Sequence, residues 1–191
     1  MTTLPLSHPK RVPGEAGVWV IIFGDLLVFS LFFGTFAWYR IQEPAVFAAS
    51  QAKMVQAFGI ANTLLLLTSS LAVVLAINAA RDDQSSRARH FATLAILLGI
   101  GFVIVKYFEY GQKIRHGLLP STNDFYMLYF TFTAVHLLHV CAGIGALAFI
   151  RARVKRPLTP GATAAIESCG LFWHLLDILW VVLFAIFYLH R

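Results

Sequence analysis

Charged residues are scarce in this sequence of 191 amino acids. Asp, Glu, Lys and Arg make up 13% of the positions, whereas hydrophobic residues make up 59%. The mean hydropathy of +0.74 is equally far from the balance of a water-soluble domain. The composition therefore excludes a soluble protein and indicates lipid as the solvent for most of the chain. The length leaves no room for a separate soluble domain.

Cysteine is also rare, with only two in the chain. Cys141 and Cys169 both fall inside apolar stretches, which argues against a disulfide framework and is typical of small buried hydrophobic residues. The formal net charge is +6, but the basic residues are scattered at the edges of apolar segments. That distribution excludes a basic face for nucleic acid and favours contact with lipid headgroups.

Long apolar runs dominate the remainder of the sequence, and each is close to the roughly 20 residues that a membrane-spanning helix needs. They are continuous rather than alternating, which excludes the strands of a membrane β-barrel. We therefore predict an all-α, polytopic membrane protein, a bundle of five transmembrane helices near residues 16–39, 57–80, 91–113, 125–150 and 168–189. Residues 16–191 are expected to form a single membrane domain after a cytoplasmic segment, residues 1–15. The first run is too long for the core of a signal peptide and lacks a clear cleavage pattern, so we expect it to be retained.

Basic residues in the connections predict the orientation. With the N-terminus inside and the C-terminus outside, nine basic residues lie on the cytoplasmic side: Lys10, Arg11, Arg81, Arg87, Arg89, Arg151, Arg153, Lys155 and Arg156. Five then lie outside: Arg40, Lys53, Lys113, Arg115 and Arg191. The positive-inside rule favours this orientation. We expect the chain to lie in the inner (plasma) membrane.

Ionisable residues inside the predicted helices are the candidate functional residues, because each costs several kcal/mol in order of magnitude unless it is paired or faces protein or water. Asp25 lies about ten residues past Glu15, or roughly 15 Å along a helix, near the bilayer midplane. Three pairs have i, i+3 spacing and so share a helix face. They are Lys106 with Glu109, His136 with His139, and His174 with Asp177.

Each candidate has two interpretations. The histidines could hold a metal ion, but hydrogen bonding between helices is favoured about four to one, because buried polar groups in bundles are usually paired with one another. Lys106 and Glu109 either form a buried functional pair or reach together to the nearby interface, with even weight. Asp25 is either a neutral carboxyl hydrogen-bonded to a neighbouring helix or an element of a proton relay.

Five motifs in order resemble subunit III of the haem-copper oxidases. They are Gly17 to Phe29 with the acid Asp25 inside, where many members have Glu, then Asn62 to Ser70, and Phe108-Glu109-Tyr110. The most specific is the His136-Leu-Leu-His139-Val-Cys-Ala-Gly143 motif, and the last is Trp173-His174-Leu-Leu-Asp177 after Glu167. The resemblance covers about 170 residues, from Gly17 to Leu189. Longer members have two additional helices, so this chain resembles the short five-helix form. Lys106 to Ile114 with Tyr126 to Phe130 is most similar to homologues from nitric-oxide reductase gene clusters.

The resemblance implies an accessory subunit without haem or copper of its own, which supports the assembly, stability and proton supply of a catalytic partner subunit. Haem, with or without copper, would lie in that partner, and phospholipid could be bound. From the residues, we predict that His136, His139, His174, Asp177 and Glu167 form one polar network between the last two helices. Asp25 would lie in or near a cleft that faces lipid or partner. The acceptor, O2 or NO, and the donor, quinol or cytochrome c, stay open.

Two other functions are compatible with part of the sequence. An autonomous proton-coupled transporter would explain the intramembrane acids and histidines, but the sequence shows no inverted repeat and no pair of broken helices at matching positions. A membrane metalloenzyme would use His136 and His139. No catalytic residue is assigned, because no Gly-rich phosphate loop and no nucleophile beside a base can be identified in the sequence.

Overall fold

A computed structural model describes residues 14–155 and 159–189, and these residues are helical almost throughout. The helices are α1 (Ala16–Gln42), α2 (Pro44–Ala52), α3 (Gln56–Arg81), α4 (Ser85–Arg115), α5 (Asp124–Arg153) and α6 (Pro160–Phe184), followed by a π-helical turn at Ala185–Leu189. Five of the helices are long and apolar enough to cross a membrane. The predicted all-α bundle of five spans is therefore confirmed.

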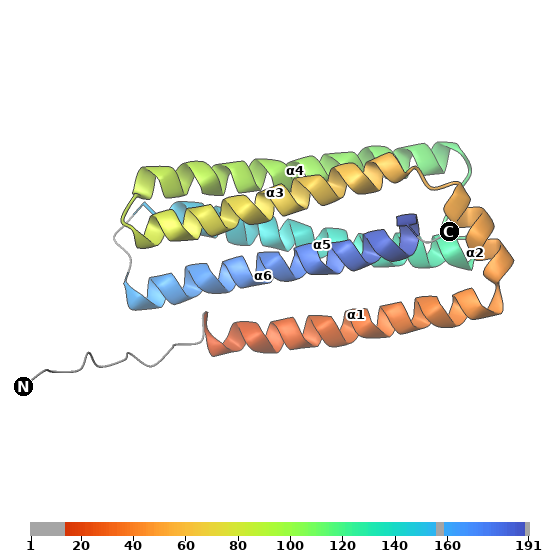
Figure 1. The fold of residues 1–191 in the computed structure, drawn as a ribbon, viewed down its shortest axis with the longest axis horizontal. Coiled ribbons are helices and arrows are strands. Elements are labelled where there is room, and N and C mark those ends of the chain that lie inside the picture. Colours follow the sequence, from red (N-terminus) through yellow and green to blue (C-terminus); the bar gives the residue numbers. More distant parts are fainter. Residues whose placement is uncertain (1–13, 156–158, 190–191) are drawn as a thin grey trace, which may run out of the picture.

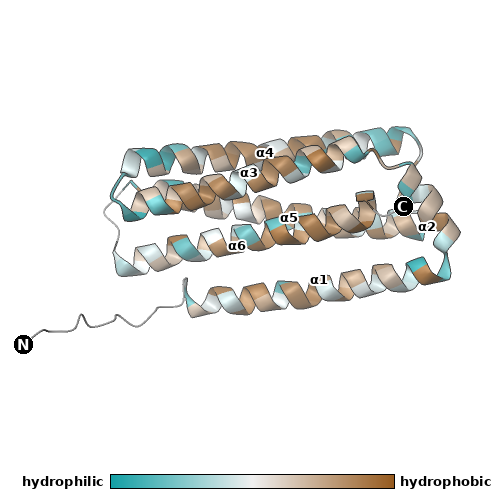
Figure 2. Ribbon diagram, viewed as in Figure 1, coloured by the Kyte–Doolittle hydropathy of each residue, from teal (hydrophilic) through white to brown (hydrophobic). Residues whose placement is uncertain are grey.

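The long helices run roughly parallel or antiparallel to one another, with α1 at one edge (Figure 1). Helices α3 and α4 pack most extensively, and α5 and α6 complete a four-helix core. Helix α1 rests against α5 and α6. Only 11% of the residues in its most apolar stretch are buried, compared with 50% in the last span. Apolar residues cover the middle of the helices, and polar residues gather at the ends of α3 and α4 (Figure 2). This is the pattern of a protein whose sides face hydrocarbon.

Several helices are longer than the apolar runs. Helix α4 begins at Ser85 and has 31 residues, which is about 46 Å at 1.5 Å per residue and exceeds the roughly 30 Å of bilayer hydrocarbon. Helix α6 begins at Pro160, eight residues before the expected span. Hydropathy detects only the part of a helix that lies in lipid, whereas the backbone continues as helix into the headgroups until a turn ends it.

Helix α2 was not expected from the sequence, where residues 40–56 read as a connection. Pro44 occupies its first position, where the missing N–H leaves no hydrogen bond unmade. The helix crosses one end of the bundle between α1 and α3 (Figure 1). There Phe47 is fully buried and packs edge-to-face with Phe36 of α1 and Phe125 of α5. These rings fix that end of α1 to the bundle.

The other end of α1 is held by polar contacts. The backbone N–H of Gly14 donates to Glu167 Oε2 at 3.1 Å, and that of Glu15 donates to Ser168 Oγ at 2.8 Å. These two residues are the described part of the predicted cytoplasmic segment, and residues 1–13 lie outside the described residues. The assignment of residues 16–191 to one membrane domain stays a prediction.

Glycines let a large aromatic side chain enter the centre of the core. Trp173 of α6 is fully buried, and it lies where side chains at Gly99 of α4 and Gly143 of α5 would stand. A Cβ at Gly143 would lie 2.8 Å from Trp173, and one at Gly99 would lie 2.9 Å from it. The three helices therefore approach one another around this indole because two positions have no side chain.

Candidate functional site

Asp25 and His139 meet between α1 and α5. The distance from Asp25 Oδ1 to His139 Nε2 is 3.3 Å, and His139 Nδ1 lies 2.8 Å from the backbone carbonyl of Val135. Because a carbonyl can only accept, Nδ1 carries a hydrogen, and the hydrogen bond on the other side of the ring needs one further proton shared by Nε2 and the carboxyl. The side chains are 19% and 27% exposed, so this pair lies at the edge of the bundle.

His174 and Asp177 also lie together, with Ser70 of α3 as a third member. Ser70 Oγ is 2.6 Å from His174 Nδ1, and Asp177 Oδ2 is 3.6 Å from the same nitrogen. A nucleophilic triad needs the serine and the carboxylate on opposite ring nitrogens. Since both groups face Nδ1 here, the arrangement links α3 to α6 and does not activate the serine.

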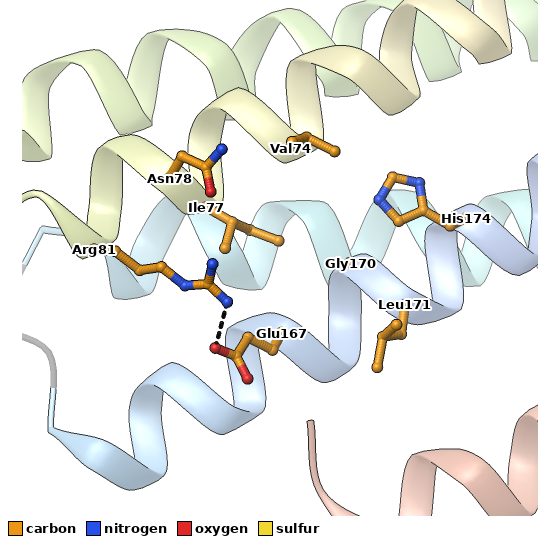
Figure 3. Close-up of a pocket in the computed structure, with 8 residues that line it drawn as sticks. All are labelled: Val74, Ile77, Asn78, Arg81, Glu167, Gly170, Leu171 and His174. Atoms are coloured by element: carbon orange, nitrogen blue, oxygen red, sulfur yellow. Dashed lines mark hydrogen bonds and ion pairs between the residues drawn. The ribbon is translucent and has the colours of Figure 1, made fainter. Parts of the chain in front are cut away.

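Glu167 lies near the start of α6, two turns before His174, and pairs with Arg81 of α3. Its Oε1 is 2.7 Å from Arg81 Nη2. The ion pair closes one end of a small cavity of about 170 Å³ between α3 and α6, and His174 lies at the other end (Figure 3). With the bond from Gly14, Glu167 joins the start of α1, the end of α3 and α6.

His136 is fully buried among aromatic rings. Its ring centre is 5.7 Å from that of Phe102 and 5.5 Å from that of Trp180, and neither nitrogen has a hydrogen-bond partner among the described residues. Over those residues, no hydrogen bond or ion pair joins His136 to His139, or either histidine to Asp177. Of the five residues predicted as one network, the structure brings His174 and Asp177 together, whereas His136 lies among aromatic rings and His139 contacts Asp25. The sequence analysis did not pair His139 with any residue of the first helix, but the structure places it against Asp25.

Lys106 and Glu109 form the most deeply buried ionic group that we find in the described chain. Lys106 Nζ is 3.0 Å from Glu109 Oε2, and the two side chains are 0% and 1% exposed. The hydroxyls of Tyr129 and Tyr188 donate to Glu109 Oε1. The pair points into the bundle, so of the two interpretations raised by the sequence, the structure contains the buried pair.

A second lysine accompanies this pair and leaves the group with an excess of positive charge. Lys113 Nζ lies 3.8 Å from Glu109 Oε1 and 3.1 Å from Met54 Sδ. Four aromatic rings surround Lys106, with centres 5.0 to 5.9 Å from Nζ: Tyr110, Tyr129, Trp180 and Tyr188. Ring faces attract cations, which offsets part of the desolvation of two ammonium groups that share one carboxylate.

Sequence reasoning missed part of this cluster for different reasons. Tyr129 belongs to the Tyr126 to Phe130 stretch that contributes to the resemblance, but the sequence does not show that its hydroxyl reaches Glu109. Tyr188 belongs to the last turn of the chain and carries no motif. Lys113 had been placed among the outer loop charges, because it stands near the end of an apolar run.

Metal-ligating residues do not gather in the described part of the chain. Over residues 14–155 and 159–189, no group of three or more His, Cys, Asp and Glu side chains has a geometry suited to a metal ion. His136 and His139, the pair considered as ligands, make contacts of different kinds, one with aromatic rings and one with Asp25. The contacts described for these two histidines are those of ring packing and hydrogen bonding between helices.

Comparison with protein families decides the relationship. The family model for cytochrome c oxidase subunit III matches residues 10–191. The chain belongs to the cytochrome c oxidase subunit III family. It is thus a multi-pass protein of the bacterial plasma membrane and a subunit III of a respiratory terminal oxidase. The predicted location and the predicted oxidase subunit are confirmed.

Relatives within the cytochrome c oxidase subunit III family come from several bacteria. The chain is 28% identical to cytochrome bo(3) ubiquinol oxidase subunit 3 of Pseudomonas putida over 91% of its own length and 84% of the relative. It is 29% identical to cytochrome c oxidase subunit 3 of Alkalihalophilus pseudofirmus, over 96% and 92% of the two chains. It is also 29% identical to quinol oxidase subunit 3 of Bacillus subtilis, over 91% and 85%.

Proposed function

We propose that this chain is the haem-free subunit III of a terminal oxidase and that it supports the assembly, stability and proton supply of the catalytic subunit. The match of residues 10–191 to the family carries the proposal. Haem, with or without copper, belongs in this proposal to the partner. The chain's own contribution is a stable bundle with the Asp25–His139 pair at its edge.

Asp25 and His139 are the residues that we assign to proton supply. Asp25 Oδ1 and His139 Nε2 lie within hydrogen-bonding distance at 3.3 Å, and both side chains are part-exposed rather than enclosed. A group that exchanges protons with a neighbour needs this combination of a hydrogen-bonded proton and access from outside. We therefore place this edge of the bundle, between α1 and α5, toward a lipid-filled or partner-facing cleft.

The orientation proposed is N-terminus inside. Three arginines lie at or near the α3–α4 turn, namely Arg81, Arg87 and Arg89. Three basic residues lie at the end of α5, namely Arg151, Arg153 and Lys155. Lys10, Arg11, Arg156 and Arg191, which also entered the prediction, lie outside the described residues. The basic residues of the two turns support a cytoplasmic position for that end of the bundle.

The electron acceptor is the finer part of the proposal. The relatives named above are subunits of cytochrome c or quinol oxidases, and they do not support a nitric-oxide reductase. The interpretation as a nitric-oxide reductase subunit rests on Lys106 to Ile114 and Tyr126 to Phe130 alone. We propose O2 as the acceptor, with cytochrome c or quinol as the donor.

Co-purification tests the function. The affinity-tagged chain, isolated from mild detergent extracts of its own host, is expected to bring with it a haem-bearing subunit whose reduced-minus-oxidised spectrum identifies an oxidase. The isolated complex should consume O2 with quinol or reduced cytochrome c, and consumption of NO instead would overturn the acceptor. Proton-dependent solute uptake by the chain alone in liposomes, without haem protein, would overturn the accessory function in favour of a transporter.

A further inference from the structure

A groove lies between the start of α4 and the end of α5, and none of the residues that line it is assigned a role in the proposed function. It measures about 430 Å³ and is bordered by Arg89, His90 and Thr93 of α4 and Arg151 of α5. Farther along α4, its wall consists of Leu94 and Leu97, which are 44% and 60% exposed. A cationic end thus passes directly into an apolar surface. This groove is separate from the edge where α1 meets α5 and α6.

The cationic end of the groove is built from side chains that hold one another. Arg151 Nε donates to Thr93 Oγ1 at 2.8 Å, across the two helices. The Thr93 hydroxyl in turn donates to the backbone carbonyl of Arg89 at 2.8 Å. One guanidinium is therefore held in place through its Nε, which leaves its other N–H groups to bind an acceptor with little further ordering.

Positive charge in the groove is not balanced by protein. No carboxylate lines it, and among the described residues neither Arg89 nor Arg151 has an ion-pair partner. A planar guanidinium matches the oxygens of a phosphate group. Two unpaired arginines and a neighbouring histidine therefore fit a phosphate with a net negative charge.

The groove also lies at the depth of a lipid headgroup. Arg89 is four residues into α4, or about 6 Å from its first residue, and Leu97 is about 18 Å along the helix. Since α4 exceeds the hydrocarbon thickness by about 16 Å, shared between its two ends, the arginine lies among headgroups and the leucines lie beside acyl chains. A ligand that fills both ends must carry a phosphate and a hydrocarbon chain together.

We propose that this groove binds an anionic phospholipid, with the phosphate on Arg89 and Arg151 and an acyl chain along Leu94 and Leu97. The lipid occupies the notch between α4 and α5 and holds the two helix ends together where their charges repel. Basic pockets between transmembrane helices at the cytoplasmic face select acidic headgroups by the same electrostatics.

Native mass spectrometry of the full-length chain, purified with its accompanying subunits and titrated with phosphatidylglycerol, tests the proposal. The Arg89→Gln/Arg151→Gln variant is expected to bind phosphatidylglycerol about tenfold more weakly or worse, because two charges near the surface are removed. The Arg89→Lys/Arg151→Lys variant, which keeps both charges, should retain most of the binding. Phosphatidylcholine, which has no net charge, should bind weakly to all forms.

The matched control removes two charges from the same end of the bundle without touching the groove. Arg87 and Lys155 are exposed and outside the lining, so Arg87→Gln/Lys155→Gln should leave the affinity within about twofold. Equal losses in the two glutamine variants would mean general charge attraction and would overturn the site. Displacement of the lipid by inorganic phosphate would assign the site to free phosphate, and absence of binding in the intact complex would assign the groove to a protein neighbour.

Discussion

Glu109 is a buried carboxylate that contacts several polar side chains at once. Its carboxylate accepts hydrogen bonds from Tyr129 and Tyr188, and it is the counter-ion of Lys106 at 3.0 Å. Buried ion pairs contribute little net stability compared with apolar residues, but breaking one leaves a charge in a medium that cannot solvate it. The importance of this residue therefore lies in what its removal would leave behind.

Replacing Glu109 with Gln should lower the free energy of unfolding in detergent by about 3–5 kcal/mol, because the buried Lys106 loses the counter-ion that its charged form requires. The Lys106→Met/Glu109→Gln double variant should lose clearly less, since the fully buried cation is gone and only Lys113, near the end of α4, stays beside the glutamine without a counter-ion. Glu43→Gln, at an exposed carboxylate beyond α1, serves as the control and should change stability by less than about 0.5 kcal/mol. A double variant less stable than Glu109→Gln alone would contradict this account.

Asp25 and His139 should be energetically coupled, because they share a hydrogen bond between helices. In a double-mutant cycle with Asp25→Asn and His139→Gln, we expect a coupling of about 0.5–1.5 kcal/mol in unfolding free energy. Asp25→Asn with His174→Gln should be additive to within about 0.5 kcal/mol, since those side chains share no partner. The same cycle for His139 and Asp177 distinguishes the predicted single network, which requires coupling, from the separate contacts seen in the structure.

At the scale of the helix, close packing depends on which glycines face a neighbour. Gly143 and Gly145 lie two residues apart on α5, but only Gly143 faces α6. A Cβ at Gly143 would meet Trp173 and Leu176 at 2.8 Å, whereas a Cβ at Gly145 would meet nothing within 4 Å. The two positions therefore separate the effect of packing from the effect of helix propensity.

The Gly143→Ala variant should be destabilised by about 1–3 kcal/mol, because Trp173 is enclosed and cannot move away from the added methyl group. Gly145→Ala should be neutral or gain up to about 1 kcal/mol, since alanine favours the helical backbone. Thermal unfolding in detergent, followed by tryptophan fluorescence, gives both values. Equal effects at the two positions would mean that the helices do not approach as closely as the structure indicates.

For the whole molecule, the cytoplasmic end is expected to carry the α3–α4 turn and the opposite end the α4–α5 connection. In a variant with Cys141→Ala and Cys169→Ala, a cysteine at Ser121 should react with a membrane-impermeant maleimide on intact spheroplasts. A cysteine at Ser86 should react only after permeabilisation. Ser86 and Ser121 are exposed at opposite ends of the bundle, so the reverse pattern would place the N-terminus outside.

Much of the fold followed from the sequence, because a bilayer imposes few choices on the backbone. Continuous apolar runs of the right length must become helices, since lipid offers the peptide groups no hydrogen bonds. The five spans are therefore correct, although their ends were placed inside the true helix ends at Ser85 and Pro160. Helix α2 was not predicted, because it lies across one end of the bundle and carries no long apolar run.

The partners of the polar residues were much harder to foresee. Spacing along one helix is enough to bring Lys106 beside Glu109 and His174 beside Asp177, because residues three apart share a helix face. It could not show that Asp25 meets His139, that Tyr188 reaches Glu109, or that His136 is enclosed by rings. These pairings depend on the rotation and the height of one helix relative to another.

The sequence by itself determined the solvent, the number of spans and the family, because composition, hydrophobic length and ordered motifs are properties of the linear chain. Only the tertiary structure decided which buried groups meet, because helix rotation and register are set by interlocking side chains such as Trp173 against Gly99 and Gly143. In lipid, the apolar faces of a helix are nearly equivalent, so close packing and hydrogen bonds decide which face turns inward.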